Sequence, residues 1–162
     1  MSLDLDIIST KPVKHKGTGV YVRKDGEVVE LKTIDEVKAY FPNIDLSNIN
    51  EVEYETNTIW SGNITHNLGQ MARNVPINDK TLYDYLWHPD VLNFKYVDQK
   101  YIDGIEIGYK YLKDNKTDLE KFNSPNGWGT YETLLNFTKS LNECLQNLII
   151  EFSDDYTIIA SI

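Results

Sequence analysis

Hydrophobic and polar residues alternate with a period of two in several parts of the chain, a pattern typical of strands that bury one face. At residues 3–8 leucine and isoleucine alternate with aspartate, and we expect Pro12 and the cluster Lys14-His15-Lys16-Gly17 to end this first strand. Residues 51–60 alternate in the same way, and the β-branched residues of 156–162 predict a terminal strand.

Residues 19–31 predict a β-hairpin. Two β-branched runs lie on either side of Asp25-Gly26, a dipeptide that favours a tight hairpin turn. A short helix should follow, because Thr33 and Glu36 have the spacing of a capping box.

After Gly62 the hydrophobic period changes to about 3.6 residues, as in helices that bury one face. The apolar residues of 64–75 form one such stripe and predict a helix from Asn63 to about Asn74. Further helices are predicted at residues 79–88, capped by Asp79, at 97–113, at 118–122, and from a Thr130 cap to about Leu148.

The order of these elements predicts an α+β fold. The first and last strands should lie in one small, mostly antiparallel sheet, with about four to five helices packed on one face. Nothing in the composition divides the chain, so residues 1–162 are expected to form a single domain. The hairpin-containing segment 17–50 is expected to be an insertion in it.

Net charge restricts the partners. The chain has 16 basic and 25 acidic residues, a formal charge of −9, and its two arginines are Arg23 and Arg73. This balance disfavours binding along a nucleic-acid backbone, which requires many cationic contacts. No apolar run approaches the ~20 residues of a membrane span, and the acidic N-terminus does not resemble a signal peptide, so we expect a cytoplasmic protein.

Composition also disfavours a metal or cofactor site. Cys144 is the single cysteine, which precludes an intramolecular disulfide, and its leucine-rich surroundings predict a small buried hydrophobe. The three histidines, His15, His66 and His88, lack metal-ligand spacing, and no dinucleotide or phosphate-loop motif occurs. We therefore predict no metal, no cofactor and no catalytic residue set.

The predicted helix after Gly62 carries an amide-rich face. Asn63, Asn67, Gln70 and Asn74 would form one polar stripe, with His66 and Arg73 beside it. Amides with an imidazole and a guanidinium can pair with the donors and acceptors of a base or a sugar. The alternative interpretation is a solvated helix face with Asn63 as its N-cap.

Aromatic residues could complete a pocket there. Trp128 is flanked by glycines that allow close approach of a partner, although it could equally cover the core. The predicted ligand-binding residues are Trp60, Asn63, His66, Asn67, Gln70, Arg73, Trp87, Trp128 and Tyr131.

Four segments together resemble a family of small phage and bacterial proteins of unassigned function. They are LDL at 3–5, NITHNLGQMA at 63–72, LWHP at 86–89 and NGWGTYE at 126–132. The resemblance covers the first strand and most of residues 60–145, but not 17–50. It implies a phage context, in which small acidic proteins often counter host defences, some by sequestering nucleotide-derived signals.

Three functions follow as hypotheses. The first is a non-enzymatic protein that binds a small nucleotide-like ligand between the helix at Asn63 and the Trp128 loop. The second is an interaction protein that inhibits a host protein, with the hairpin at 20–31 as its contact surface. The third is a small hydrolase with His66 as general acid or base. A homo-oligomer is left open.

Overall fold

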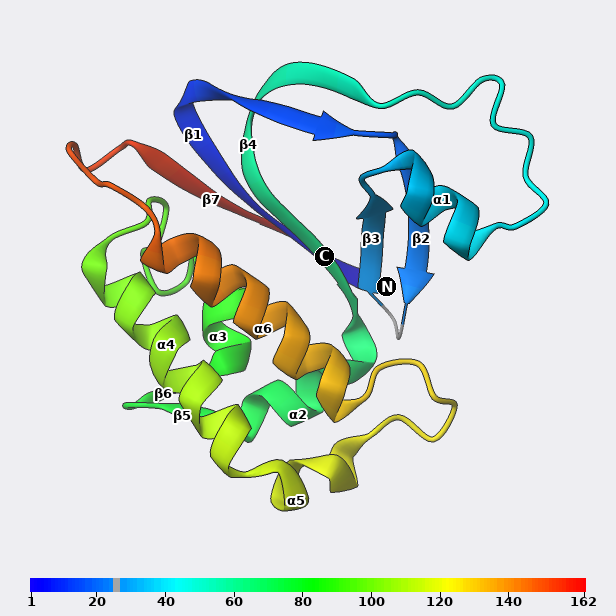
Figure 1. The fold of residues 1–162 in the computed structure, drawn as a ribbon. Coiled ribbons are helices and arrows are strands. Elements are labelled where there is room, and N and C mark those ends of the chain that lie inside the picture. Colours follow the sequence, from blue (N-terminus) through cyan, green and yellow to red (C-terminus); the bar gives the residue numbers. More distant parts are fainter. Residues whose placement is uncertain (25–26) are drawn as a thin grey trace.

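The computed structural model describes residues 1–24 and 27–162 and has an α+β fold (Figure 1). Its main sheet is antiparallel with the strand order β4-β1-β7, in which β1 is Ser2–Gly17, β4 is Val52–Thr65 and β7 is Tyr156–Ser161. The prediction that the first and last strands share one sheet is confirmed.

Alternation in β1 separates the two faces of this sheet. Leu3, Leu5 and Ile7 are fully buried and face the helices. Because successive side chains of a strand point to opposite faces, Asp4 and Asp6 lie on the other face. One strand therefore supplies both the floor of the core and a polar surface.

The first strand runs through Pro12, which was predicted to end it together with the cluster 14–17, and stops at Gly17, the last residue of that cluster. β1 pairs with β4 as far as Ile8, shifts register, and resumes pairing from Val13 to Gly17. Pro12 lies in the shifted stretch, where the N–H group that proline lacks is not needed for a ladder hydrogen bond. The bulge therefore lets one strand continue past a residue that would interrupt a regular one.

Beyond the bulge, β1 and β4 leave the body of the molecule as a curved two-stranded ribbon, which we call the arch (Figure 1). From its end the chain turns back toward the helices as a hairpin of β2 (Val20–Lys24) and β3 (Glu27–Leu31). The paired strands confirm the predicted hairpin, while its Asp25-Gly26 turn lies outside the described residues.

A short helix, α1 (Ile34–Tyr40), follows the hairpin and shares a small core with it, formed by Val22, Leu31 and Val37. The Thr33 hydroxyl caps α1 as predicted. The carboxylate of Glu36 accepts its hydrogen bond from the Lys32 N–H rather than from the Thr33 N–H.

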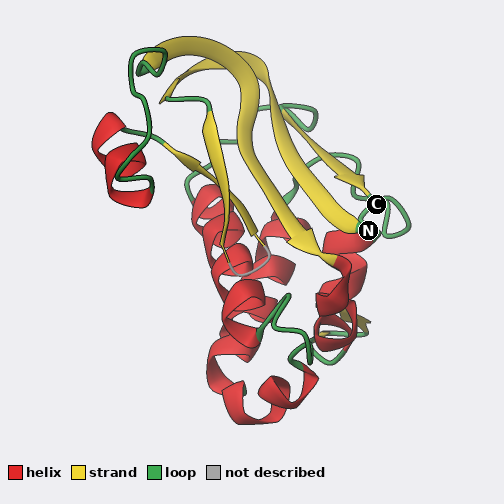
Figure 2. Ribbon diagram, turned by 90° about the vertical axis from the view of Figure 1, so that its right-hand side faces the viewer, coloured by secondary structure: helices red, strands yellow, loops and turns green. Residues whose placement is uncertain are grey.

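The remaining helices lie together on one side of the main sheet (Figure 2). They are η1 (His66–Leu68), α2 (Gly69–Arg73), α3 (Leu82–Trp87), α4 (Gln99–Asp114), α5 (Lys116–Leu119), η2 (Glu120–Phe122) and α6 (Tyr131–Gln146). Two short strands, β5 (Pro76–Ile77) and β6 (Lys80–Thr81), form a small hairpin before α3. Within the described ranges, no helix is both long and apolar enough to cross a membrane.

The predicted helix start at Asn63 is wrong. β4 continues to Thr65, because Asn63 and Ile64 pair with Asp4 and Leu3 of β1. The hydroxyl of Thr65 then caps η1 by accepting the Asn67 N–H. Sheet pairing over a long sequence distance thus outweighs the local helical spacing of the apolar residues.

The predicted cap of α3 is also wrong. Asp79 lies in the turn between β5 and β6, next to Asn78 with its φ of 56°. Thr81 caps α3 instead, and its N–H and hydroxyl each lie 2.8 Å from the carboxylate of Asp84. The prediction that Thr130 caps the last helix is confirmed.

Candidate functional site

A cleft of about 680 Å³ lies between the arch, the hairpin and the β4 edge of the main sheet. We call it the arch cleft. Asp4 and Asp6 line it from the outer face of the sheet, whereas Trp60, which pairs with the buried Ile7, lines it from the helix-facing side. The sheet supplies Asp4, Asp6 and the stretch 58–63, the arch supplies His15 and Tyr54, and the hairpin supplies Tyr21 and residues 28–30. Ser140 of α6 closes one end. This volume falls within the ~300–1,000 Å³ range of small-molecule sites.

Two aspartates form the acidic floor of the arch cleft. Asp4 lies opposite Asn63 and Asp6 lies opposite Ser61 in the β1–β4 register. The Asn63 amide donates a hydrogen bond to the Asp4 carboxylate and also accepts one from Arg23 at 3.4 Å. Asp6 is half-buried, and within the described part of the chain its carboxylate has no hydrogen bond or ion pair.

Trp60 forms an aromatic wall at the edge of β4. Its indole N–H donates to the Ser140 hydroxyl at 3.0 Å, and its ring meets Phe137 edge-on with 5.2 Å between centroids. Gly62 leaves room for the Trp60 ring to pack against Phe137. A Cβ on residue 62 would lie 2.5 Å from the Phe137 ring and 2.6 Å from the Trp60 ring. The sequence Trp60-Ser61-Gly62 therefore positions the indole against the helical layer.

A hydrogen-bonded contact between His15 and Glu30 joins the arch to the hairpin. The His15 imidazole Nε2 lies 3.0 Å from a carboxylate oxygen of Glu30, and the Gly19 N–H donates to the other oxygen at 3.1 Å. Burial would raise the pKa of Glu30, but the hydrogen bonds from His15 and Gly19 outweigh it and lower this pKa below its ordinary value. The Tyr54 ring lies beside His15, with 5.1 Å between centroids.

Tyr21 lies on the hairpin side of the cleft. Its side chain is exposed, yet burial and then the nearby Glu30 charge raise its phenol pKa above the ordinary value. Tyr21 is therefore a neutral hydroxyl with an aromatic face at neutral pH. Tyr54 and Trp60 add two further rings to the same cleft.

The predicted ligand-binding residues separate into several groups. Trp60 and Asn63 line the arch cleft. His66, Arg73 and Trp87 lie in an aromatic cluster within the helical layer. Asn67 contacts Trp128, and Gln70 is exposed. Tyr131 belongs to the core. The structure therefore does not bring the nine residues together.

The amide stripe is not formed as one helix face. Asn63 belongs to β4, whereas Asn67 follows it in η1 and donates to the backbone carbonyl of Trp128 at 3.2 Å. The Asn74 amide donates to the carbonyl of Gln70 at 2.8 Å. These amides satisfy backbone groups at helix ends and in the Trp128 loop, which is a structural use.

The Trp128 loop packs directly on η1. A Cβ on Gly129, whose φ is 91°, would lie 2.5 Å from the Thr65 side chain and 3.0 Å from Leu68. The Trp128 ring itself is 51% exposed, with the Arg23 guanidinium 5.8 Å from its centroid. The Tyr131 hydroxyl, by contrast, is buried and donates to the Leu112 carbonyl at 2.6 Å.

The aromatic cluster around Trp87 is a packed unit. Trp87 is 1% exposed and stacks on Tyr83 with 5.0 Å between centroids. The Arg73 guanidinium lies 3.6 Å from the Tyr83 centroid, and His66 meets Trp87 edge-on. His66 Nδ1 and Trp87 Nε1 are buried without a hydrogen-bond partner among the described residues. His66 thus lies away from the arch cleft.

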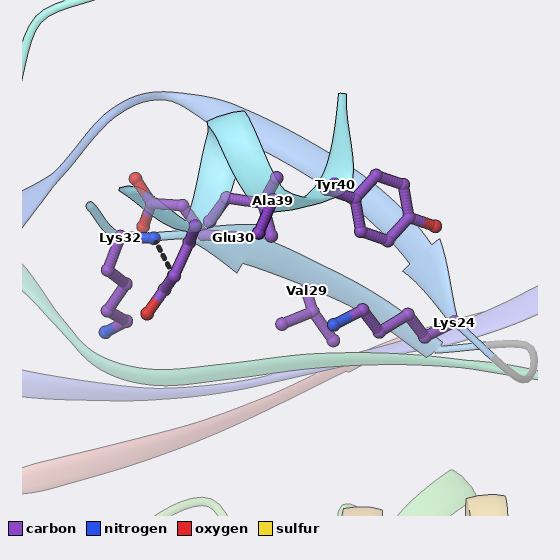
Figure 3. Close-up of a pocket in the computed structure, with 8 residues that line it drawn as sticks. Lys24, Val29, Glu30, Lys32, Ala39 and Tyr40 are labelled. Atoms are coloured by element: carbon purple, nitrogen blue, oxygen red, sulfur yellow. Dashed lines mark hydrogen bonds between the residues drawn. The ribbon is translucent and has the colours of Figure 1, made fainter. Parts of the chain in front are cut away.

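A second hollow of about 530 Å³ borders the arch cleft on the α1 side of β3. Figure 3 shows Lys24 and Lys32 at its two ends, with Val29 between them and Tyr40 on the α1 wall. A third hollow of similar volume lies along β7, next to Phe94 and residues 158–160. Both are less polar and present fewer aromatic rings than the arch cleft.

Most residues of the arch cleft are not predicted by the sequence, because they are distant along the chain. Asp4 and Asp6 are the exception, since they form the polar half of an alternating strand. Across the described residues, no group of three or more His, Cys, Asp or Glu side chains could hold a metal ion. Comparisons with family models, with curated proteins and with solved structures give no match. A function for this protein must therefore be inferred from the residues that line the arch cleft and from their geometry.

Proposed function

We propose that the protein binds a small nucleoside-like molecule in the arch cleft without chemically changing it. The observation that carries this proposal is the pairing, in one cleft, of three aromatic rings with polar groups at fixed positions. Trp60, Tyr21 and Tyr54 supply ring faces for a flat ligand, while Asp6 and Ser61 supply acceptors and a hydroxyl for its edge.

The hydrogen bonds inside the cleft favour binding over catalysis. His15, the histidine of the cleft, is held by the Glu30 carboxylate. In the described parts of the chain, no serine, threonine or cysteine side chain hydrogen-bonds to His15, so the nucleophile–base contact of covalent catalysis is not formed. The Ser140 hydroxyl is used instead to hold Trp60.

Nuclear magnetic resonance of the three indole N–H groups tests this proposal. The panel comprises nucleosides, nucleobases, cyclic dinucleotides and ADP-ribose. A ligand in the arch cleft should shift the Trp60 indole signal in a saturable way, and Trp60→Leu should weaken its binding. Trp128→Leu, which alters an exposed indole outside the cleft, is the matched control and should leave binding unchanged.

Two results would count against the proposal. One is the absence of a Trp60 shift with every compound of the panel. The other is turnover of a bound compound, since the cleft would then be an active site.

A second candidate function is capture of a host protein by the hairpin–α1 unit. Tyr40 and Phe41 are 41% and 38% exposed and adjacent, and α1 stands apart from the helical layer (Figure 2). Exposed aromatic residues are common anchors of protein interfaces. Replacing Tyr40 and Phe41 by serine should then abolish capture of a host protein and leave small-molecule binding intact. In the phage context of the sequence resemblance, either activity would act against a host defence.

A further inference from the structure

Among the described residues, three carboxylates line the arch cleft, and they differ in their partners. Glu30 is paired with His15 and accepts the Gly19 N–H. Asp4 accepts the Asn63 amide, which Arg23 also contacts. Asp6 has neither kind of partner within the described residues, although its side chain is half-buried. Its charge is therefore the least compensated of the three.

The Asp6 carboxylate lines the arch cleft, where a bound ligand could contact it. Asp6 lies in the central strand of the sheet, between Ser61 of β4 and Ile159 of β7 in the strand register. Ser61 is a small neighbour that leaves the carboxylate open to the cleft. A half-buried carboxylate gains most from a partner that donates a charged hydrogen bond.

The walls of the cleft favour the same kind of ligand. The ring faces of Tyr21 and Tyr54 attract cations through their negative quadrupoles, and the Trp60 ring adds an aromatic surface across the β4 edge, on the face opposite to Asp6. The net charge of −9 raises the local concentration of cations around the protein. A phosphate group would instead meet Asp4, Asp6 and Glu30, and among the described residues that line the cleft Lys32 is the one lysine.

We infer that the arch cleft selects aromatic ligands that carry a protonated amine, that Asp6 is the residue that recognises this amine, and that phosphorylated ligands are excluded. This inference rests on the proposed function and gives it a ligand class, a cationic aromatic amine. A nucleoside-like ligand of this class would present ring and amine, with no phosphate.

Three indole compounds of similar shape test the charge preference: tryptamine, which is cationic, tryptophol, which is neutral, and indole-3-acetate, which is anionic. Adenosine and AMP form a second comparison. Dissociation constants are measured from the Trp60 indole signal. Tryptamine should bind about tenfold more tightly than tryptophol, the scale of one hydrogen bond to a charged group. Indole-3-acetate and AMP should bind more weakly than their uncharged counterparts.

Variants of Asp6 separate its role from a general charge effect. Asp6→Asn should bring the dissociation constants of tryptamine and tryptophol within about twofold of each other, because the charged hydrogen bond is lost. Asp6→Glu keeps the carboxylate and should keep the preference. Asp154→Asn makes the same change in net charge at an exposed turn position and should also keep it. Unfolding temperatures of all variants show whether each one is folded.

The outcomes distinguish this inference from the proposed function. If indole-3-acetate or AMP binds as tightly as its partner compound, or if Asp6→Asn retains the amine preference, the inference is wrong while the binding site stands. If none of the five compounds and no member of the wider panel shifts the Trp60 signal, the site itself is wrong.

Discussion

The His15 imidazole lies 3.0 Å from the Glu30 carboxylate, and this contact joins β1 of the arch to β3 of the hairpin. The two residues approach each other because the chain reverses after Gly17 and again between β2 and β3. Both residues line the arch cleft, so their contact forms part of its wall. The candidate site therefore includes a side-chain contact between the arch and the hairpin in addition to the backbone pairing of the sheet.

The first prediction concerns the pH dependence of this contact. The folded-state pKa of Glu30 is lowered, so its ionised form stabilises the fold above the unfolded carboxyl pKa, and this stability is lost as pH falls through the lower folded value. Glu30→Gln should therefore lower the unfolding temperature at pH 7, and the difference from the natural protein should shrink toward pH 3. A constant difference over that range would contradict this assignment.

The second prediction concerns Gly17, whose Cα faces the Glu30 carboxylate. A Cβ at this position would overlap the carboxylate, so Gly17→Ala should displace Glu30 and release it from His15. We expect faster hydrogen exchange of the Gly19 N–H, which donates to Glu30. In the double variant Gly17→Ala, Glu30→Ala the clash is absent, and the cost of the Gly17 substitution should largely disappear.

The third prediction concerns the packing of the Trp60 side chain. Gly62→Ala adds a Cβ that collides with both Phe137 and Trp60, and overpacking of this kind costs about 1–3 kcal/mol. The Trp60 indole should lose its bond to Ser140, which a shift of its N–H resonance would report. Ser61→Ala is the control, since Ser61 is exposed and makes no such contact. Equal effects of the two substitutions would show that Gly62 has no special role.

The fourth prediction concerns Cys144 of α6, which is half-buried. Burial raises its thiol pKa to about 11, so at pH 8 only about one thiol in a thousand is ionised. Its reaction with a disulfide reagent should be about two orders of magnitude slower in the folded protein than in urea. Reaction at the same rate in both states would mean that the thiol is exposed.

The elements that the sequence predicted well are those whose signals are local. The hairpin strands follow from two β-branched runs, and α6 begins at Thr130 because its hydroxyl caps the first turn. The alternation of residues 3–8 predicted a strand with one buried face, and Leu3 and Leu5 are indeed fully buried. Each of these features depends on neighbouring residues alone.

The features that the sequence did not predict depend on pairing between distant residues. Ile64 fits both a helical stripe and a strand, and its pairing with Leu3 decides for the strand. The arch cleft combines His15, Glu30 and Tyr54, whose proximity requires the β1–β4 register beyond Pro12. A strand that ended at Pro12 could not bring them together, whereas the amides after Gly62 are close in sequence and give a local signal.

The pairing of β1 with both β4 and β7 has a consequence for the order in which the fold is completed. β1 pairs Ser9 with Tyr156, so the sheet joins segments from opposite ends of the described chain. During synthesis, β1 and β4 can associate as soon as residues near 65 are available, whereas one edge of β1 remains unpaired until β7 has left the ribosome. Most of the buried core lies outside β7, which contributes Ile158, so β7 docking should be a late step that covers the second edge of β1.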